Sequence, residues 1–196
     1  MKVTREESAA RREQIVEIAS ELFRIHGFDG VAISDIMKAV GVTHGGFYGH
    51  FESKEQLAAE ACTRANTRNR WDRYMDGPVH QRLGRIVGGY LSERHRDDPG
   101  HGCLLAAVAT DVIRQPRSVR DAFTSALRSK VDLLISLMPG QSATARRAKS
   151  LATLSGLVGT LILARAVNDR ELSNEILSAG VTMFAEAAGE RRGIRA

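Results

Sequence analysis

Cysteine, proline and aromatic residues are all scarce in this sequence of 196 residues. It contains two cysteines, four prolines and 5% aromatic residues. Cys62 and Cys103 are too few for a disulfide framework, and their spacing is not that of a zinc finger. The sequence therefore predicts a protein of a reducing compartment, and we expect it to hold no metal and no cofactor.

Long hydrophobic runs are also missing. The longest stretch without a charged residue, residues 150–164, contains several serine, threonine and glycine residues. It is too short and too polar to span a bilayer. The amino terminus has no apolar stretch of the kind that a secretory signal requires. We therefore expect a cytoplasmic protein that has no membrane partner.

The charge of the chain is positive but unevenly distributed. The formal net charge is +5 at pH 7, which is common among proteins that bind nucleic acids. Residues 1–56 carry seven Lys/Arg and nine Asp/Glu, a net of −2, and residues 57–196 carry 21 and 14, a net of +7. Net charge alone therefore assigns a nucleic-acid site to neither part, and local geometry must decide.

Apolar residues recur at helical spacing along most of the chain. No segment alternates apolar and polar residues in the manner of a strand. The sequence therefore predicts an all-α fold of about nine helices. Helices are expected over residues 6–26, 34–40, 43–51, 53–71, 79–95, 103–114, 118–138, 143–167 and 172–188. Thr4 and Glu7 form a possible capping box before the first of them, and Gly27 is a suitable end for it.

Two short helices joined by a tight turn at Gly41 and packed on the first helix would form a helix-turn-helix. In the second short helix, Phe47 and Phe51 lie one turn apart and would face the core. Residues 43–51 contain no acidic residue, and glycines stand at positions 45, 46 and 49. Each glycine costs a helix about 1 kcal/mol relative to alanine. A helix with such a bare face fits the major groove of DNA, which would explain the glycines.

The same segment resembles a known family. The residues that carry the resemblance are Gly27-Phe28, Asp35-Ile36, Gly41-Val42-Thr43, Gly46-Phe47-Tyr48, His50-Phe51 and Ser53-Lys54-Glu55-Gln56-Leu57. They are similar to the N-terminal module of the tetracycline-repressor (TetR) family of bacterial transcriptional regulators. The resemblance implies a three-helix DNA-binding head over residues 1–56 and a helical effector-binding and dimerisation domain over residues 57–196. It also implies a homodimer, a repressor that a small molecule releases from a palindromic operator.

The resemblance assigns roles to single residues. Tyr48 and Lys54 match the phosphate-contacting tyrosine and lysine of the family, and His50 matches a position that often contacts the DNA backbone. The hydroxyl of Thr43 is a further suitable phosphate donor. The positions that read base edges in the family are here His44, Gly45, Gly46 and Gly49.

The sequence departs from the family pattern at two places. Val31 and Ala32 replace the hydroxyl residues that are usual before the second helix, so these side chains supply neither the phosphate contact nor the N-cap of the family. Because glycines fill most of the reading positions, DNA shape or the thymine methyl group would contribute to specificity.

Two late segments, the predicted helices over residues 143–167 and 172–188, are candidates for a dimer interface. The helix over residues 143–167 is apolar on nearly all sides, as expected for a helix that is covered from two directions. The alternative is the core of a monomer. We favour a dimer, because one short helix contacts too few base pairs for selective binding. The predicted interface residues are Leu154, Leu157, Val158, Leu161, Leu177, Val181 and Phe184.

Residue type and region predict an effector pocket, although each of these side chains could instead belong to the core. The candidates are Trp71, Tyr74, Tyr90, His101, Cys103 and Phe123. Cys103 is expected at a helix N-terminus shortly after His101, where a thiol gains reactivity. Cys103 is therefore a possible redox or electrophile sensor, and the alternative is an inert buried thiol.

Two other classes of protein compete with a regulator. A cysteine-dependent enzyme could use Cys103 with His101 or His95, but no third residue that would orient the histidine is evident. A helical scaffold that only binds partner proteins would show no steep salt dependence with duplex DNA. We therefore expect no catalytic residue, and we predict a DNA-binding regulator associated with the nucleoid.

Overall fold

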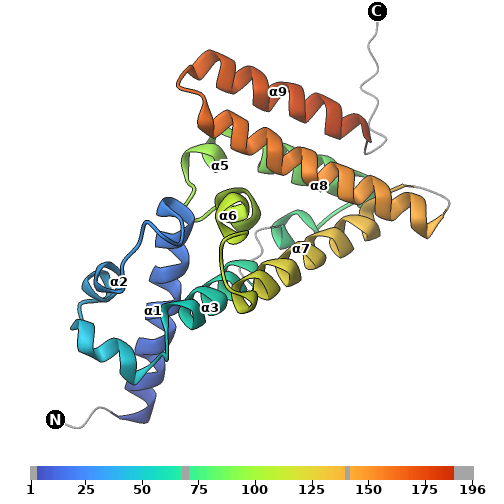
Figure 1. The fold of residues 1–196 in the computed structure, drawn as a ribbon. Coiled ribbons are helices and arrows are strands. Elements are labelled where there is room, and N and C mark those ends of the chain that lie inside the picture. Colours follow the sequence, from blue (N-terminus) through green and yellow to red (C-terminus); the bar gives the residue numbers. More distant parts are fainter. Residues whose placement is uncertain (1–3, 68–70, 140–141, 188–196) are drawn as a thin grey trace, which may run out of the picture. The chain divides into compact units, whose positions relative to one another are not determined.

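The computed structural model describes residues 4–67, 71–139 and 142–187, and the described residues form helices joined by turns and loops (Figure 1). The predicted all-α fold is confirmed. The α-helices are α1 (Arg5–His26), α2 (Ile33–Val40), α3 (Lys54–Thr67), α4 (Val79–Tyr90), α5 (Glu93–Asp97), α6 (Leu104–Val112), α7 (Arg117–Leu137), α8 (Ala143–Ala166) and α9 (Arg170–Ala187). Two 3-10 helices, η1 (His44–Gly49) and η2 (Asp72–Tyr74), complete the set. None of the described helices is long and apolar enough to cross a membrane.

The chain divides into two compact units. The first unit comprises residues 1–68 and 99–126, and the second comprises residues 69–98 and 127–196. In the first unit, α1 packs against α2, α3 and α6. In the second unit, α8 and α9 pack along each other, and α4 packs against both.

The capping box predicted for α1 is present. Glu7 N donates to Thr4 Oγ1 at 3.1 Å, and Thr4 N donates to Glu7 Oε2 at 2.8 Å. These hydrogen bonds satisfy two backbone N–H groups at the start of the helix and fix where it begins. At its other end α1 is stopped by Gly27, whose φ of +75° is a conformation that favours glycine.

Residues 99–126 are fastened to the end of α1 within the first unit. Arg24 is buried, and its Nε donates to Gly100 O at 2.6 Å while its Nη1 donates to Ser20 Oγ at 2.7 Å. A Cβ atom at Gly27 would overlap the carboxylate of Asp111 in α6. Glycine at position 27 is therefore required by the close approach of α6 as well as by its backbone conformation.

The start of α2 is capped without a hydroxyl group. Ala32 occupies the N-cap position, and its N–H donates to Asp35 Oδ2 at 2.9 Å. The helix ends at Gly41 in the left-handed conformation, with a φ of +76°. Val42 N then donates to Met37 O at 3.0 Å, which closes the turn tightly. The turn leads directly into η1.

The predicted helix over residues 79–95 is wrong in one respect, because it is two helices. The backbone of Ser92 is extended, and its Oγ accepts a hydrogen bond from His95 N at 3.2 Å. This N-cap starts α5 in a new direction after α4 has ended at Tyr90. Apart from the helix over residues 43–51, which is described below, the other predicted helices agree with the observed ones to within a few residues over the described part of the chain. Residues 68–70 and 188 of the predicted helices lie outside it.

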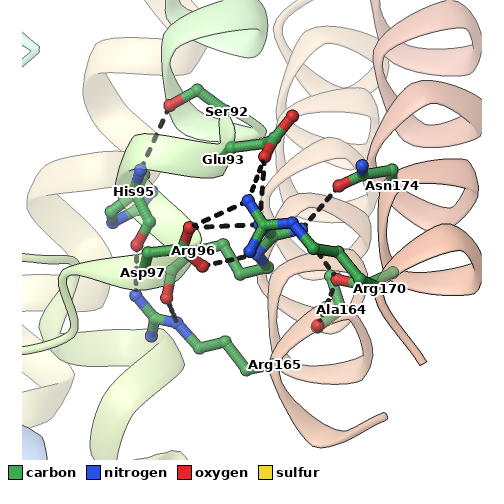
Figure 2. A network of polar contacts seen from close by, with 10 residues as sticks. Ser92, Glu93, His95, Arg96, Asp97, Ala164, Arg165, Arg170 and Asn174 are labelled. Atoms are coloured by element: carbon green, nitrogen blue, oxygen red, sulfur yellow. Dashed lines mark hydrogen bonds and ion pairs between the residues drawn. The ribbon is translucent and has the colours of Figure 1, made fainter. Parts of the chain in front are cut away.

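Arg96 of α5 lies at the centre of a polar network in the second unit (Figure 2). Its guanidinium donates to the Asp97 carboxylate at 2.7 and 3.1 Å and to Glu93 at 3.2 Å. It also reaches α9, where it donates to Ser173 Oγ at 3.0 Å and to Asn174 Oδ1 at 2.6 Å. The hydrogen bond from Arg96 holds the pKa of Asp97 below its ordinary value.

Two further arginines extend this network. Arg165 of α8 donates to the carbonyl oxygens of His95, at 2.6 Å, and Arg96, at 3.1 Å. Arg170 of α9 donates to Glu93 at 2.7 Å. The five-residue helix α5, which is too short to be stable alone, is in this way held between α8 and α9.

Candidate nucleic-acid interface

The second helix of the helix-turn-helix is η1, a 3-10 helix and not the predicted α-helix. Gly46 N donates to Thr43 O at 3.0 Å, and His50 N donates to Phe47 O at 2.9 Å. Thr43 stands at the N-cap position, and its side chain makes no capping hydrogen bond. Glycine has low α-helical propensity, and short segments often adopt the tighter 3-10 form.

Two phenylalanines attach η1 to the rest of the head, as predicted. Phe47 and Phe51 are buried, and their rings stack with centroids 5.5 Å apart. The Arg12 guanidinium of α1 lies over the Phe51 ring, 4.6 Å from its centroid. Arg12 also donates to Glu60 of α3 at 2.6 Å. These contacts tie Phe51, just after η1, to α1, and η1 itself packs against α2. The outer face of η1 is therefore presented on a packed base.

The outer face of η1 carries the residues that the sequence assigned to DNA. Tyr48 is 63% exposed, and its ring meets Phe47 edge-on at 5.2 Å. The His44 ring lies against Tyr48 at 6.1 Å. His50 and Lys54 are half-buried, and the remaining assigned residues are exposed, namely Thr43, His44, Gly45, Gly46 and Gly49. Seven of the eight residues therefore lie in one short segment, residues 43–51, that has no acidic side chain, and Lys54 is the first residue of α3.

A groove of about 830 Å³ lies beside η1. We name it the glycine groove. It is lined by Ser8, Arg11, Lys38, Gly41, Val42, Thr43, Gly46, Gly49 and His50. Sequence reasoning missed Arg11 and Lys38, which α1 and α2 contribute to its walls. Both are exposed basic residues in amphipathic helices, and only the packing of α1 beside η1 reveals that they line the same groove.

The predicted effector residues fall into both units. In the second unit, Trp71 and Tyr90 are buried and their rings meet edge-on at 5.8 Å. Tyr74 lies against Gly89, where a Cβ atom would overlap its hydroxyl. The Lys130 ammonium lies over the Trp71 ring at 4.8 Å. The structure therefore brings Trp71 and Tyr90 into direct contact.

The other three effector candidates belong to the first unit. Cys103 is at the N-cap of α6, as predicted, and is partly exposed. His101 is exposed, and its Nε2 lies 3.4 Å from Glu21 Oε1. Phe123 is half-buried on α7. The second cysteine, Cys62, is fully buried, and burial raises the pKa of its thiol to about 12.

The predicted dimer residues divide into two groups. Leu154, Leu157, Leu161 and Leu177 are buried within the single chain. Val158, Val181 and Phe184 are partly exposed, and the Phe184 ring lies where a Cβ atom at Gly156 would be. Between them, α8 and α9 still expose Leu151, Leu163, Leu172 and Met183.

The described residues contain no group of three or more His, Cys, Asp or Glu side chains that could hold a metal ion. The chemistry that the candidate site offers is therefore that of hydrogen-bond donors, cations and bare backbone. These groups suit a polyanion that carries phosphates.

Comparisons with known proteins point to one family. The family model of "Bacterial regulatory proteins, tetR family" matches residues 15–61, which include α2, η1 and most of α1 and α3. The HTH-type transcriptional regulator AcrR of Shigella flexneri is 37% identical over 57 residues, which are 29% of this chain and 26% of that protein. The chain thus matches only about a quarter of the length of the first curated relatives.

Two comparisons extend over most of the chain. The HTH-type transcriptional regulator TtgR of Pseudomonas putida is 28% identical over 192 residues, which cover 95% of this chain and 80% of that protein. The crystal structure of a TetR transcriptional regulator from Chloroflexus aurantiacus is 24% identical, with a TM-score of 0.78, and covers 94% of this chain and 97% of that one. The family model, the long relative and the fold agree, and together they support a transcriptional regulator of the tetR family.

Proposed function

We propose that this protein is a homodimeric transcriptional repressor that binds a palindromic DNA operator and leaves it when an effector binds. One observation carries the proposal: the exposed, acid-free face of residues 43–50 is mounted on the buried rings of Phe47 and Phe51. A rigid helix with small or polar side chains on its outer face can enter the major groove. We assign DNA contact to the eight predicted residues, with Tyr48 and Lys54 on phosphates and His44 on a base edge.

The outer surfaces of α8 and α9 support the homodimer. No charged residue occurs from Ser150 to Ala164, although Leu163 is 57% exposed. Met183 of α9 is 65% exposed. At Gly159 of α8, a Cβ atom would meet nothing within 4 Å. A second copy of the chain would cover these uncharged surfaces, and it would place two heads on two half-sites of a palindrome.

Substitutions in η1 and at Lys54, the first residue of α3, test DNA binding; they are called the η1 variants below. With a duplex selected by the protein from a random library, Tyr48→Ala and Lys54→Ala should each weaken binding about fivefold to tenfold across all sequences. Lys54→Ala should also reduce the slope of log Kd against log salt by about 1, because it removes one phosphate contact. His44→Ala should change the preferred sequence instead. Fluorescence anisotropy at several salt concentrations measures all three effects.

Lys149→Ala serves as the matched control, because Lys149 is an exposed lysine of α8. It should leave both the affinity and the salt slope unchanged. Tyr48 is exposed, so its variant should also keep the wild-type Tm. If no duplex is selected at low salt, or if the η1 variants bind as the wild type does, the head has been assigned the wrong role.

We propose that the effector binds among the aromatic and polar residues that the sequence singled out. Trp71, Tyr74 and Tyr90 offer aromatic surface in the second unit, and the cation of Lys130 lies over Trp71. His101, Cys103 and Phe123 are the candidates of the first unit. Because Trp71 is the single tryptophan of the chain, its fluorescence reports ligands that bind beside it in a screen of small molecules.

A reactive species is the second candidate effector, because the two thiols differ in their surroundings. Cys103 is partly exposed at a helix N-terminus, whereas Cys62 is buried with a pKa of about 12. We expect Ellman's reagent to label one thiol in the native protein and two after denaturation. The Cys103→Ser variant should show no rapid native labelling, and labelling of Cys62 at the same rate would contradict this expectation.

The sensor role of Cys103 has its own test. Hypochlorite or a quinone should release the selected duplex from the wild-type protein and not from Cys103→Ser. An equal response of the two proteins would leave the small-molecule effector as the alternative.

A further inference from the structure

Three glycines of η1 have no explanation within the described part of the chain. A Cβ atom at Gly45 or Gly49 would meet nothing within 4 Å. At Gly46 it would lie 3.8 Å from Met37 Cε and 3.9 Å from Thr43 Oγ1, which are ordinary contact distances. The backbone imposes no requirement either, because the positive-φ glycines of the described residues are at positions 27, 41 and 77.

Glycine in a helix lowers stability relative to alanine. At these positions the cost is not offset by packing or by a special backbone conformation. Apart from the 3-10 form of η1, which their low α-helical propensity favours, the remaining reason for glycine is the close approach of another molecule to the η1 backbone. Gly46 and Gly49 lie three residues apart, on the same face of a 3-10 helix, and both line the glycine groove.

The walls of the glycine groove are cationic. Arg11 and Lys38 are exposed and line the groove. Glu7, one turn before Arg11 on α1, interacts electrostatically with Arg11, and its Oε2 also accepts the N–H of Thr4. None of the nine lining residues is acidic. The groove thus combines three glycines with two positive side chains in its lining, which complements a chain of phosphates.

We propose that the glycine groove seats a sugar-phosphate strand of the bound duplex. Arg11 and Lys38 pair with its phosphates, and Gly46 and Gly49 allow the strand to touch the backbone of η1. The proposal rests on the proposed function, because the strand belongs to the duplex that η1 enters. It adds two cations and two positions of close approach to the contacts that the family pattern assigns.

The glycines are tested by opposite effects on stability and affinity. Gly49→Ala and Gly46→Ala should each raise the Tm by about 2 °C and weaken binding of the selected duplex at least about tenfold. Gly88→Ala is the matched control, because Gly88 is an exposed glycine of α4 where a Cβ atom meets nothing within 4 Å. It should raise the Tm by a similar amount and leave the affinity unchanged.

The cations are tested by neutralising either partner of each contact. Arg11→Gln and Lys38→Gln should each reduce the salt slope by about 1, whereas Lys149→Gln should not. Duplexes with one neutral methylphosphonate at successive positions then locate the phosphate. At the phosphate that Lys38 contacts, the substitution should weaken the wild-type protein about fivefold and should not weaken Lys38→Gln further.

The outcomes separate this proposal from the one on which it rests. If Tyr48→Ala and Lys54→Ala weaken binding but the groove variants bind as the wild type does, the head binds DNA and the groove does not. If the glycine variants gain stability and keep full affinity, close approach is excluded. If the η1 variants have no effect, DNA binding by the head itself fails.

Discussion

Replacing Leu163 with arginine is expected to separate the proposed homodimer into monomers and to weaken operator binding about 100-fold. Leu163 projects from a helix segment that has no charged residue over residues 150–164. In an isologous interface each substitution occurs twice, so two buried positive charges without partners would be introduced. Affinity falls because a duplex with two half-sites gains about 100-fold or more when both heads are joined. Analytical ultracentrifugation measures the dimer, and anisotropy measures the affinity.

Ile113→Arg is the control for this substitution. Ile113 is 68% exposed in the first unit, so the change places the same charge on a different surface. It should leave the dimer and the affinity intact. A Leu163→Arg protein that sediments as a dimer would show that α8 does not form the interface.

Replacing Arg96 with methionine is expected to destabilise the protein by about 3 kcal/mol. Arg96 is buried, and it donates hydrogen bonds to Ser173 and Asn174 as well as to its two acidic neighbours. Loss of a buried, charged donor removes several of these bonds at once and leaves polar groups of α9 without their partner. The substitution detaches α5 from α9, and chemical denaturation measures the loss.

The loss of stability caused by Arg96→Met should become smaller at low pH. Because the folded-state pKa of Asp97 is lowered, its stabilising contribution is present above the unfolded pKa and is lost as pH falls through the folded value. The difference between the wild type and Arg96→Met should therefore shrink below about pH 4. Arg94→Met, at an exposed position of the same helix, should change stability little at any pH. If Arg96→Met and Arg94→Met lower the free energy of unfolding equally, the buried network of Arg96 does not stabilise the protein as proposed.

Much of the fold was predictable because its signals are local. The Thr4–Glu7 capping box, the glycine stop at Gly41 and the paired rings of Phe47 and Phe51 all follow from spacing along one helix or turn, and the structure contains each of them. The match to the tetR family model and to the long relative also agrees with the predicted class, a transcriptional regulator. The division into residues 1–56 and 57–196 stays a prediction.

The errors arise where several weak local preferences compete. Residues 43–51 have the apolar spacing of an α-helix, but the glycines leave that conformation too little favoured, and η1 forms instead. Ser92 interrupts an otherwise continuous helical pattern because its side chain can cap a new helix. Propensity along the chain does not reveal which alternative tertiary packing will select.

The dimer and the glycine groove depend on packing that the sequence does not encode locally. An apolar stripe shows that a helix is covered, but not whether the cover comes from its own chain. Leu154, Leu157 and Leu161 are covered within the chain by packing of the second unit, and the interface assignment stays a prediction. Similarly, Arg11 and Lys38 resemble ordinary surface cations until α1 and α2 are placed around η1.

The hydrogen bond from Arg24 to Gly100 limits which segment can be transferred when the DNA-binding head of one such protein is grafted onto another. Because α1 leans on a segment found some 70 residues further along the chain, with Gly27 against Asp111 as a second point of support, the head is not a detachable cassette. A hybrid that borrows only the first 56 residues from a relative would carry a foreign surface into that contact. Grafting residues 99–126 together with residues 1–56 would keep the contacts between the two segments. Selection within the family would then favour changing the two segments together.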